Sequence, residues 1–288
     1  MSIATPRSIA RTVRGMPTSD GAGVKLTRVI GQSQLTELDP FLMLDEFGTD
    51  NPGDYIAGFP DHPHRGFETV TYMLDGRMRH RDNHGHEGVL IPGSVQWMTA
   101  GRGIVHSEMP EQQSGRMRGF QLWINLPARD KMCAPRYQEF GPEQIPAVTL
   151  DGARVKVIAG ALAGVTGPIA QPATDPLYFD IALEPGGRFS PTLPAGHAAF
   201  LYVYEGALRV GAESTVLQAH QLAVLTAGET VPLESAAGSA GDPAGRTSRA
   251  ILVAGRPLHE PVARYGPFVM NRREELEQAF EDYQNGRF

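Results

Sequence analysis

Between residues 24 and 127 the chain alternates short segments of apolar and polar residues with polar turns. Segments such as FETVTYML (67–74) and RGFQLWINL (118–126) are rich in β-branched and aromatic residues, and glycine, proline, aspartate or asparagine separates them. A second series of this kind runs from residue 153 to residue 255 and includes LYFDIAL (177–183). Short strands at regular spacing predict antiparallel sandwiches or barrels, so we expect an all-β protein.

The two series are alike in their internal order. FETVTYMLDGRMRHR (67–81) and AFLYVYEGALRVG (199–211) each contain an aromatic alternating strand, then Asp-Gly or Glu-Gly, then another strand. Asp-Gly between two such strands is a hairpin signal, so the pattern predicts a duplicated β-domain. The polar, proline-bearing segment 128–148 is the candidate boundary, and we expect domains at 1–133 and 134–288. Residues 236–248, rich in glycine, alanine and serine, predict a flexible hairpin loop.

One helix is expected, at the C-terminal end of the second domain. Asn271 has the character of an N-cap, Glu274 follows three residues later, and Gly286 is a stop signal. Apolar residues recur at helical spacing between these points, so we predict a helix over 271–285 whose apolar stripe packs on the sheets.

The composition argues against several kinds of partner and against a disulfide. The net charge of −6 opposes binding to a phosphate backbone, so we expect no direct nucleic-acid partner. Cys133 is the single cysteine, which excludes an intramolecular disulfide. The sequence contains no apolar run of membrane-spanning length and no secretory signal pattern, so we expect no membrane partner and a cytoplasmic location.

Two pairs of side chains have the spacing of metal ligands. His62 and His64 are two residues apart in FPDHPHRGFETVTY, and His106 and Glu108 are two apart in AGRGIVHSEMP. Residues i and i+2 of a strand point to the same side, so each pair can face one ion. Three imidazoles and one carboxylate suit iron, zinc, manganese or copper. One such histidine pair alone fits a solvated loop equally well, and the second pair favours a metal.

Other candidates stay open at this point. His84 and His86 form a rival pair, but their glycine-flanked polar segment favours an exposed turn. His80 fits a cavity-facing position and a surface position equally well. Glu68 shares the strand parity of the first histidine pair, and it suits a ligand, an ion pair with a nearby arginine, or a hydrogen bond that orients a ligand.

Four stretches closely resemble the pirin family, two-domain members of the cupin superfamily. They are DPFLMLDEF (39–47), HPHRGFETVTY (62–72), GSVQWMTAGRGIVHSEMP (93–110) and the terminal GPFVMN with EDYQNGRF. The resemblance implies two tandem jelly-roll (double-stranded β-helix) domains, with a degenerate second domain that holds no metal. It also implies one divalent metal in the first domain, usually Fe(II), with zinc, manganese, copper or nickel as alternatives. The implied ligands are His62, His64, His106 and Glu108. The sequence departs from the usual text of the family at HRDNHGHEG, where His84 and His86 are extra.

The resemblance further implies a quercetin 2,3-dioxygenase-like oxidoreductase that opens a flavonol with release of carbon monoxide. Glu108 would be both ligand and general base, and Phe59, Trp97 and Met98 are guesses for the apolar wall around the substrate. The alternative is a redox-sensitive regulatory protein without enzymatic activity, which acts through protein partners and is nuclear in a eukaryote. A scaffold that carries little metal is a third interpretation.

Overall fold

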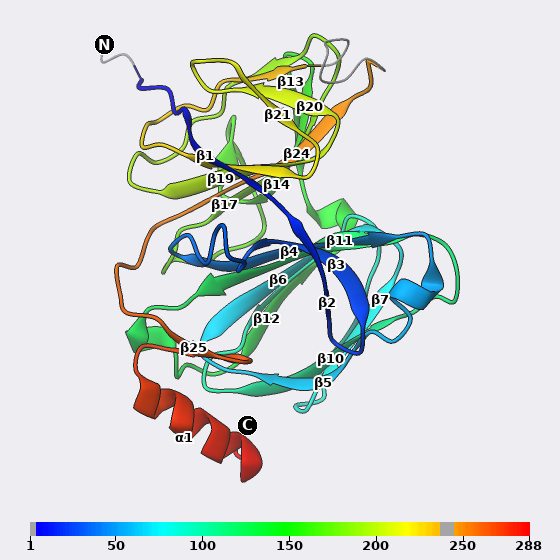
Figure 1. Ribbon diagram of the computed structural model, residues 1–288, viewed down its shortest axis with the longest axis vertical. Coiled ribbons are helices and arrows are strands. Elements are labelled where there is room, and N and C mark those ends of the chain that lie inside the picture. Colours follow the sequence, from blue (N-terminus) through cyan, green and yellow to red (C-terminus); the bar gives the residue numbers. More distant parts are fainter. Residues whose placement is uncertain (1–3, 237–244) are drawn as a thin grey trace. The chain divides into compact units, whose positions relative to one another are not determined.

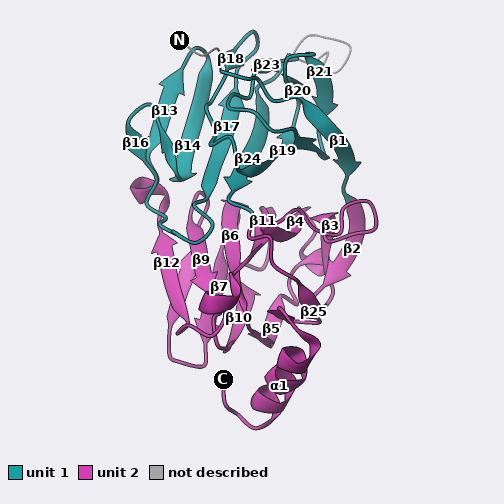
Figure 2. Ribbon diagram, turned by 90° about the vertical axis from the view of Figure 1, so that its left-hand side faces the viewer, with its two compact units in different colours: residues 1–15, 145–257 teal, residues 16–144, 258–288 magenta. Residues whose placement is uncertain are grey.

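The computed structural model describes residues 4–236 and 245–288, so much of the loop expected at 236–248 lies outside the described residues. Strands make up most of the described chain, with a single α-helix near the C-terminus (Figure 1). The chain divides into two compact units, coloured in Figure 2: unit 1 comprises residues 1–15 and 145–257, and unit 2 comprises residues 16–144 and 258–288.

Unit 2 is an antiparallel sandwich of a seven-stranded and a four-stranded sheet. The large sheet has the order β12 (Arg136–Phe140), β9 (Val95–Thr99), β6 (Phe67–Asp75), β11 (Met117–Asn125), β4 (Phe41–Thr49), β3 (Val24–Ile30) and β2 (Met16–Asp20). The small sheet has the order β5 (Phe59–His64), β10 (Ile104–Pro110), β7 (Met78–Asp82) and β8 (Glu87–Leu90). Short 3-10 turns at η1 (Pro52–Asp54), η2 (Ala128–Asp130) and η3 (Pro142–Gln144) connect the strands.

Unit 1 repeats this topology. Its large sheet has the order β1 (Ile9–Arg14), β22 (Gln221–Leu225), β19 (Ala198–Glu205), β24 (Ser248–Gly255), β17 (Leu177–Leu183), β14 (Ala153–Ala159) and β13 (Ala147–Leu150). Its small sheet has the order β18 (Arg188–Phe189), β23 (Leu233–Ser235), β20 (Ala207–Val210) and β21 (Thr215–Gln218), and a two-stranded piece pairs β15 (Ala161–Leu162) with β16 (Val165–Thr166). Strands β4 to β11 and β17 to β24 occupy matching places in chain order. Each unit is therefore an eight-stranded jelly roll with added strands, and the duplication predicted from the sequence is confirmed.

The division in space differs from the contiguous segments 1–133 and 134–288 expected from the sequence. Strand β1 pairs with β22 in unit 1, at the sheet edge that β12 occupies in unit 2. The C-terminal segment, including the helix, belongs to unit 2. Alternation of apolar residues indicates that a segment is a strand, but not which sheet edge the strand joins. For this reason the sequence did not predict this exchange, in which each end of the chain belongs to the other unit.

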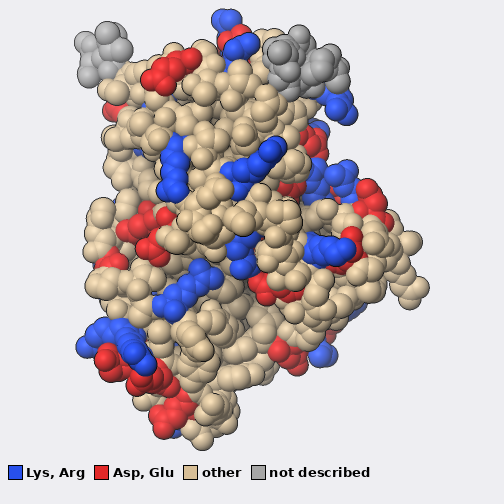
Figure 3. Space-filling view, in the orientation of Figure 1, with Lys and Arg blue, Asp and Glu red and all other residues tan. Residues whose placement is uncertain are grey.

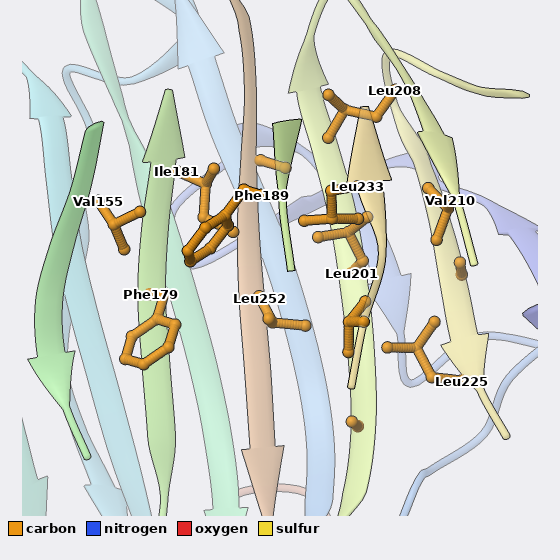
Figure 4. Close-up of a cluster of buried hydrophobic side chains, with 14 of the residues drawn as sticks. Val155, Phe179, Ile181, Phe189, Leu201, Leu208, Val210, Leu225, Leu233 and Leu252 are labelled. Atoms are coloured by element: carbon orange, nitrogen blue, oxygen red, sulfur yellow. The ribbon is translucent and has the colours of Figure 1, made fainter. Parts of the chain in front are cut away.

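The interior of unit 1 is apolar. Side chains from both of its sheets form one buried cluster, part of which is drawn in Figure 4 and which includes Phe179, Leu201 and Leu252 from the large sheet and Phe189 and Leu233 from the small sheet. Because alternate residues of each strand point inward, the sheets interdigitate over this cluster. Apolar side chains therefore occupy the space that, in unit 2, is partly polar.

The helix α1 (Arg273–Gln284) confirms the predicted element with a shifted start. Its N-cap is Arg272 rather than Asn271, and the carboxylate of Glu275 accepts hydrogen bonds from both backbone N–H groups at 3.0 Å. The apolar stripe packs on the hairpin β25 (Ala263–Tyr265) and β26 (Phe268–Met270), not on the main sheets. An ion pair of 2.8 Å between Arg65 and Asp282 links α1 to the end of β5.

No helix within residues 4–236 and 245–288 combines the length and the apolar content needed to span a bilayer. On the face of the described residues seen in Figure 3, Lys and Arg side chains are interspersed with Asp and Glu side chains.

Candidate metal centre

Strands β5 and β10 bring three histidines together. The strands pair antiparallel, and His62 lies directly opposite His106. The ring centroids of His62 and His106 are 4.4 Å apart, those of His62 and His64 are 4.7 Å apart, and those of His64 and His106 are 5.1 Å apart. One nitrogen atom from each ring lies within 4.8 Å of the other two. This group, here called the histidine triad, can hold a metal ion.

Two tight turns position these strands. Gly66 connects β5 to β6 with a φ of +88°, and an added Cβ would lie 2.0 Å from the carbonyl oxygen of Val269. Gly101, before β10, has a φ of +52°, and its Cβ would lie 2.3 Å from the carbonyl oxygen of Cys133. Only glycine fits such positions without displacing backbone. The buried Nζ of Lys131 donates to the carbonyl oxygens of Gly66 at 2.7 Å and Val269 at 3.0 Å, which fixes the first turn.

Burial favours the uncharged imidazole at two of the three histidines, His64 and His106. Burial lowers the pKa of His64 well below its usual value, and the neighbouring His62 adds to this effect. Burial also lowers the pKa of His106 well below its usual value, followed by the influence of His64 and His62. A neutral imidazole presents a lone pair, which is the form that coordinates a metal.

Hydrogen bonds orient two of the rings. Nδ1 of His62 lies 2.8 Å from the carbonyl oxygen of Pro60, and Nδ1 of His64 lies 3.4 Å from that of Pro267. A ring whose Nδ1–H donates to a carbonyl presents Nε2 as its ligand atom. Both ring nitrogens of His106 are buried without a hydrogen-bond partner among the described residues. A bound cation would give His106 the partner that the protein itself does not provide, so the triad fits a metal.

Glu108 lies beside the triad but is not one of its members. The register between β5 and β10 shifts between His106 and Glu108, and the carboxylate is outside the group of close ligand atoms. The Thr71 hydroxyl lies 2.9 Å from Oε1 of Glu108, and Nε2 of Gln121 lies 3.5 Å from Oε2. The carboxylate is 4% exposed at the residue level and is held by these two side chains from the opposite sheet.

A cavity of about 670 Å³ opens at the triad. Its apolar wall is formed by aromatic and aliphatic side chains, namely Leu26, Met43, Phe47, Phe59, Met78 and Trp123. His62, His64, Glu108 and Gln121 line the same cavity. Trp97 and Met98 are fully buried and are not among its lining residues, so Phe59 alone of the three expected wall residues lines this cavity.

Charged groups surround the cavity as well. Arg28 forms an ion pair of 2.7 Å with the buried carboxylate of Asp45, and both residues line the cavity. The guanidinium of Arg264 lies 4.8 Å from the ring centroid of Trp123, and the indole of Trp123 lies 5.2 Å from the ring of His64. The cavity therefore combines flat apolar walls with a few fixed polar groups, as ligand sites do.

The structure places the remaining candidate site residues in different surroundings. Glu68 is fully buried and accepts a hydrogen bond of 2.6 Å from Thr99, outside the triad. His84 is exposed, as expected, and His86 is partly exposed. His80 is 1% exposed, so the surface position is wrong, but His80 is not among the residues that line the cavity at the triad.

Sequence reasoning missed Thr71, Gln121, Trp123 and, elsewhere in the barrel, Glu139. Gln121 carried a signal, because it is a polar residue in the middle of an otherwise apolar strand. Glu139 had none, since the segment around it looked like a connection rather than a strand.

In the described part of unit 1, no group of side chains is equivalent to the triad. Within the described residues, both side-chain groups that could hold a metal lie in unit 2. Strands β18 and β23, which match β5 and β10 in place, carry Arg188, Phe189 and Leu233–Ser235 and no histidine.

Two jelly rolls of matching topology, one with histidines converging beside a cavity, define a two-domain cupin. A family model described as Pirin matches residues 23–124, and one described as Pirin C-terminal cupin domain matches residues 178–288. The chain belongs to the pirin family.

Similar proteins span nearly the whole chain. A pirin-like protein of Caulobacter vibrioides is 56% identical over 284 residues, which cover 98% of this chain and 99% of that protein. Pirin of Homo sapiens is 43% identical over 284 residues, covering 98% of this chain and 93% of that protein. Among solved structures, quercetin 2,3-dioxygenase from Acinetobacter baumannii superposes with a TM-score of 0.88 at 31% identity, covering 98% of each chain.

Proposed function

We propose that the protein is a metal-dependent dioxygenase that opens a flavonol such as quercetin and releases carbon monoxide. The observation that carries this proposal is the histidine triad, which adjoins a cavity with aromatic walls. The similarity to a quercetin 2,3-dioxygenase of Acinetobacter baumannii over 98% of the chain supports an oxidoreductase.

The proposed metal ligands are His62, His64, His106 and Glu108, and Fe(II) is the expected metal. The same donors also accept zinc, manganese, copper or nickel. When bound, the metal supplies Lewis acidity that lowers the pKa of a coordinated hydroxyl group. Because three of the donors are already assembled, we expect little rearrangement of the strands on metal binding.

Phe59 and Trp123 line the cavity and offer aromatic faces to a flat substrate. Arg28 and Arg264, at the same cavity, are positioned to orient the phenolic hydroxyl groups of a flavonol. Glu108 lines the cavity next to the triad, so its carboxylate is the group that would accept the proton of the substrate hydroxyl.

The test is turnover by protein purified without oxygen and loaded with Fe(II). Loss of quercetin absorbance should accompany carbon monoxide release, and His106→Ala should lower this turnover by at least about a hundredfold. His84→Ala is the matched control, because His84 is exposed and outside the triad, and it should behave as the wild type.

Unchanged turnover in His106→Ala would show that the proposed centre is wrong. Absence of turnover in fully iron-loaded wild-type protein would exclude flavonols as substrates. The alternative of a metal-dependent regulatory protein would then be favoured.

A further inference from the structure

A second group of potential ligands lies in unit 2, apart from the histidine triad. It consists of His80 on β7, His86 just before β8, and Glu139 on β12. One ligand atom from each of the three lies within 4.8 Å of the other two. This group could not be predicted from the sequence, because it joins the segment of His84 and His86 to a carboxylate about 50 residues away.

Both histidine rings approach the same carboxylate oxygen. Oε2 of Glu139 lies 2.9 Å from Nε2 of His80 and 3.4 Å from Nε2 of His86. His80 is 1% exposed, and despite this proximity neither of its ring nitrogens is aligned for a hydrogen bond with any described residue. A buried imidazole without a hydrogen bond is costly. This arrangement of two ring nitrogens and one carboxylate oxygen suits the binding of a cation.

Two neighbouring residues shape the space among these three side chains. Gly88 lies opposite His80 in the β7–β8 pair, and a Cβ there would lie 2.5 Å from Nε2 of His80 and 2.7 Å from Oε1 of Glu139. The missing side chain therefore keeps the space between the ligands open. Tyr137 stacks on His86 with ring centroids 4.2 Å apart and an interplanar angle of 26°, which holds the more exposed imidazole in place.

We propose that His80, His86 and Glu139 form a second site for a divalent transition metal, typified by Zn²⁺. Two histidines and one carboxylate are a donor set that zinc accepts with an open fourth position. A cavity of about 440 Å³ lined by Asp82, His84, His86 and Tyr137 gives solvent and ions access to that position. The proposal does not depend on the dioxygenase activity or on occupancy of the triad.

The place of the site in the fold indicates what the ion does. Strand β8 is the edge of the small sheet, and β12 is the edge of the large sheet. An ion held by His80, His86 and Glu139 connects these two edges and closes the sandwich on that side. The site therefore stabilises unit 2, as structural metal sites do.

A row of polar side chains crosses the large sheet between the two centres. Gln121, Thr71, Gln96 and Glu139 are successive cross-strand partners on β11, β6, β9 and β12. Nε2 of Gln96 donates to Oε2 of Glu139 at 3.3 Å, and Thr71 contacts Gln121 at 2.6 Å. The row therefore has members next to both centres.

The test is the zinc stoichiometry of the full chain, measured by elemental analysis after equilibration with Zn²⁺ and a chelator of micromolar affinity. The double variant His62→Ala/His64→Ala removes two members of the triad and reports the second site alone. It should retain one equivalent of zinc, whereas the wild type binds two. Adding Glu139→Gln to that double variant should reduce the remaining equivalent at least tenfold. Adding His259→Ala instead should leave it unchanged, because His259 is exposed and belongs to neither group of ligands.

A folded His62→Ala/His64→Ala protein that retains no zinc would overturn the proposal. Zinc retained equally after addition of Glu139→Gln would overturn it as well. Gly88→Ala on the same double-variant background provides a check that leaves all ligands in place, and it should lower zinc affinity because its methyl group fills the site. Circular dichroism of each variant separates loss of zinc from loss of fold, and failure of quercetin turnover affects none of these outcomes.

Discussion

The hydroxyl of Thr71 on β6 lies 2.9 Å from Oε1 of Glu108 on β10, so the two sheets of unit 2 meet at the carboxylate that we propose accepts the substrate proton. A hydrogen bond donated to a carboxylate fixes the position of the accepting oxygen. Thr71 thus acts as a positioning residue for Glu108.

Thr71→Val should lower the rate about tenfold, because it removes the hydroxyl that holds the carboxylate of Glu108. Thr71→Ser keeps the hydroxyl and should restore the rate toward that of the wild type. The measurement is quercetin turnover with iron-loaded protein. Identical rates for the Val and Ser variants would rule out this role of the hydroxyl.

Trp123→Ala should weaken flavonol binding. Trp123 lines the cavity and lies 5.2 Å from His64, so its removal takes away an aromatic face next to the metal centre. Aromatic contacts of this kind contribute about 1 kcal/mol, which corresponds to an increase in KM of about fivefold to tenfold. Trp123→Phe retains an aromatic ring and should lie between the wild type and Trp123→Ala. A fall in kcat with an unchanged KM would argue against a substrate-facing wall at this position.

Gly66→Ala should destabilise unit 2 much more than Gly85→Ala. Both glycines have a φ of +88°, so the backbone penalty for alanine is the same at both positions. A Cβ at Gly66 would lie 2.0 Å from the carbonyl oxygen of Val269, whereas nothing lies within 4 Å of a Cβ at Gly85. We expect a difference in unfolding free energy of at least about 2 kcal/mol, measured by denaturant titration. Equal effects of the two substitutions would show that the turn at Gly66 tolerates a side chain.

Lys131 should make stability depend on pH. Burial lowers the pKa of Lys131 from 10.5 to about 7 in the folded protein. Between these values the unfolded chain binds a proton that the folded chain does not, so the free energy of unfolding rises with pH. The slope is about 1.4 kcal/mol per pH unit. Below pH 7 both states are protonated, and the contribution becomes constant.

The measurement for Lys131 is the difference in unfolding free energy between the wild type and Lys131→Met from pH 7 to pH 9.5. Lys131→Met should be the less stable protein at pH 9, because the acceptors at Gly66 and Val269 lose their donor. A difference that stays constant over this range would mean that Lys131 is charged throughout.

Much of the centre could be predicted from strand alternation. His62 with His64 and His106 with Glu108 share strand parity, and parity decides which side of a sheet a residue faces. Parity does not give the distances between side chains, and the carboxylate of Glu108 lies outside the group of three close histidines.

Side-chain partners from strands far apart in the sequence were harder to predict. Glu139 on β12 of the large sheet meets His80 on β7 of the small sheet, and these two strands come together only when the barrel closes. The two repeated barrels could likewise be predicted from the alternation of apolar and polar residues. The pairing of β1 with β22 could not, because it depends on which sheet edge is left open.

The exchange of chain ends has a consequence for biosynthesis. Strand β1 leaves the ribosome some two hundred residues before its partner β22. Asp282, which pairs with Arg65 near the histidine triad, likewise follows Arg65 by some two hundred residues. Neither barrel can reach its finished form until its later segment has been synthesised, so a gene cut after residue 144 would yield two incomplete halves rather than two independent domains.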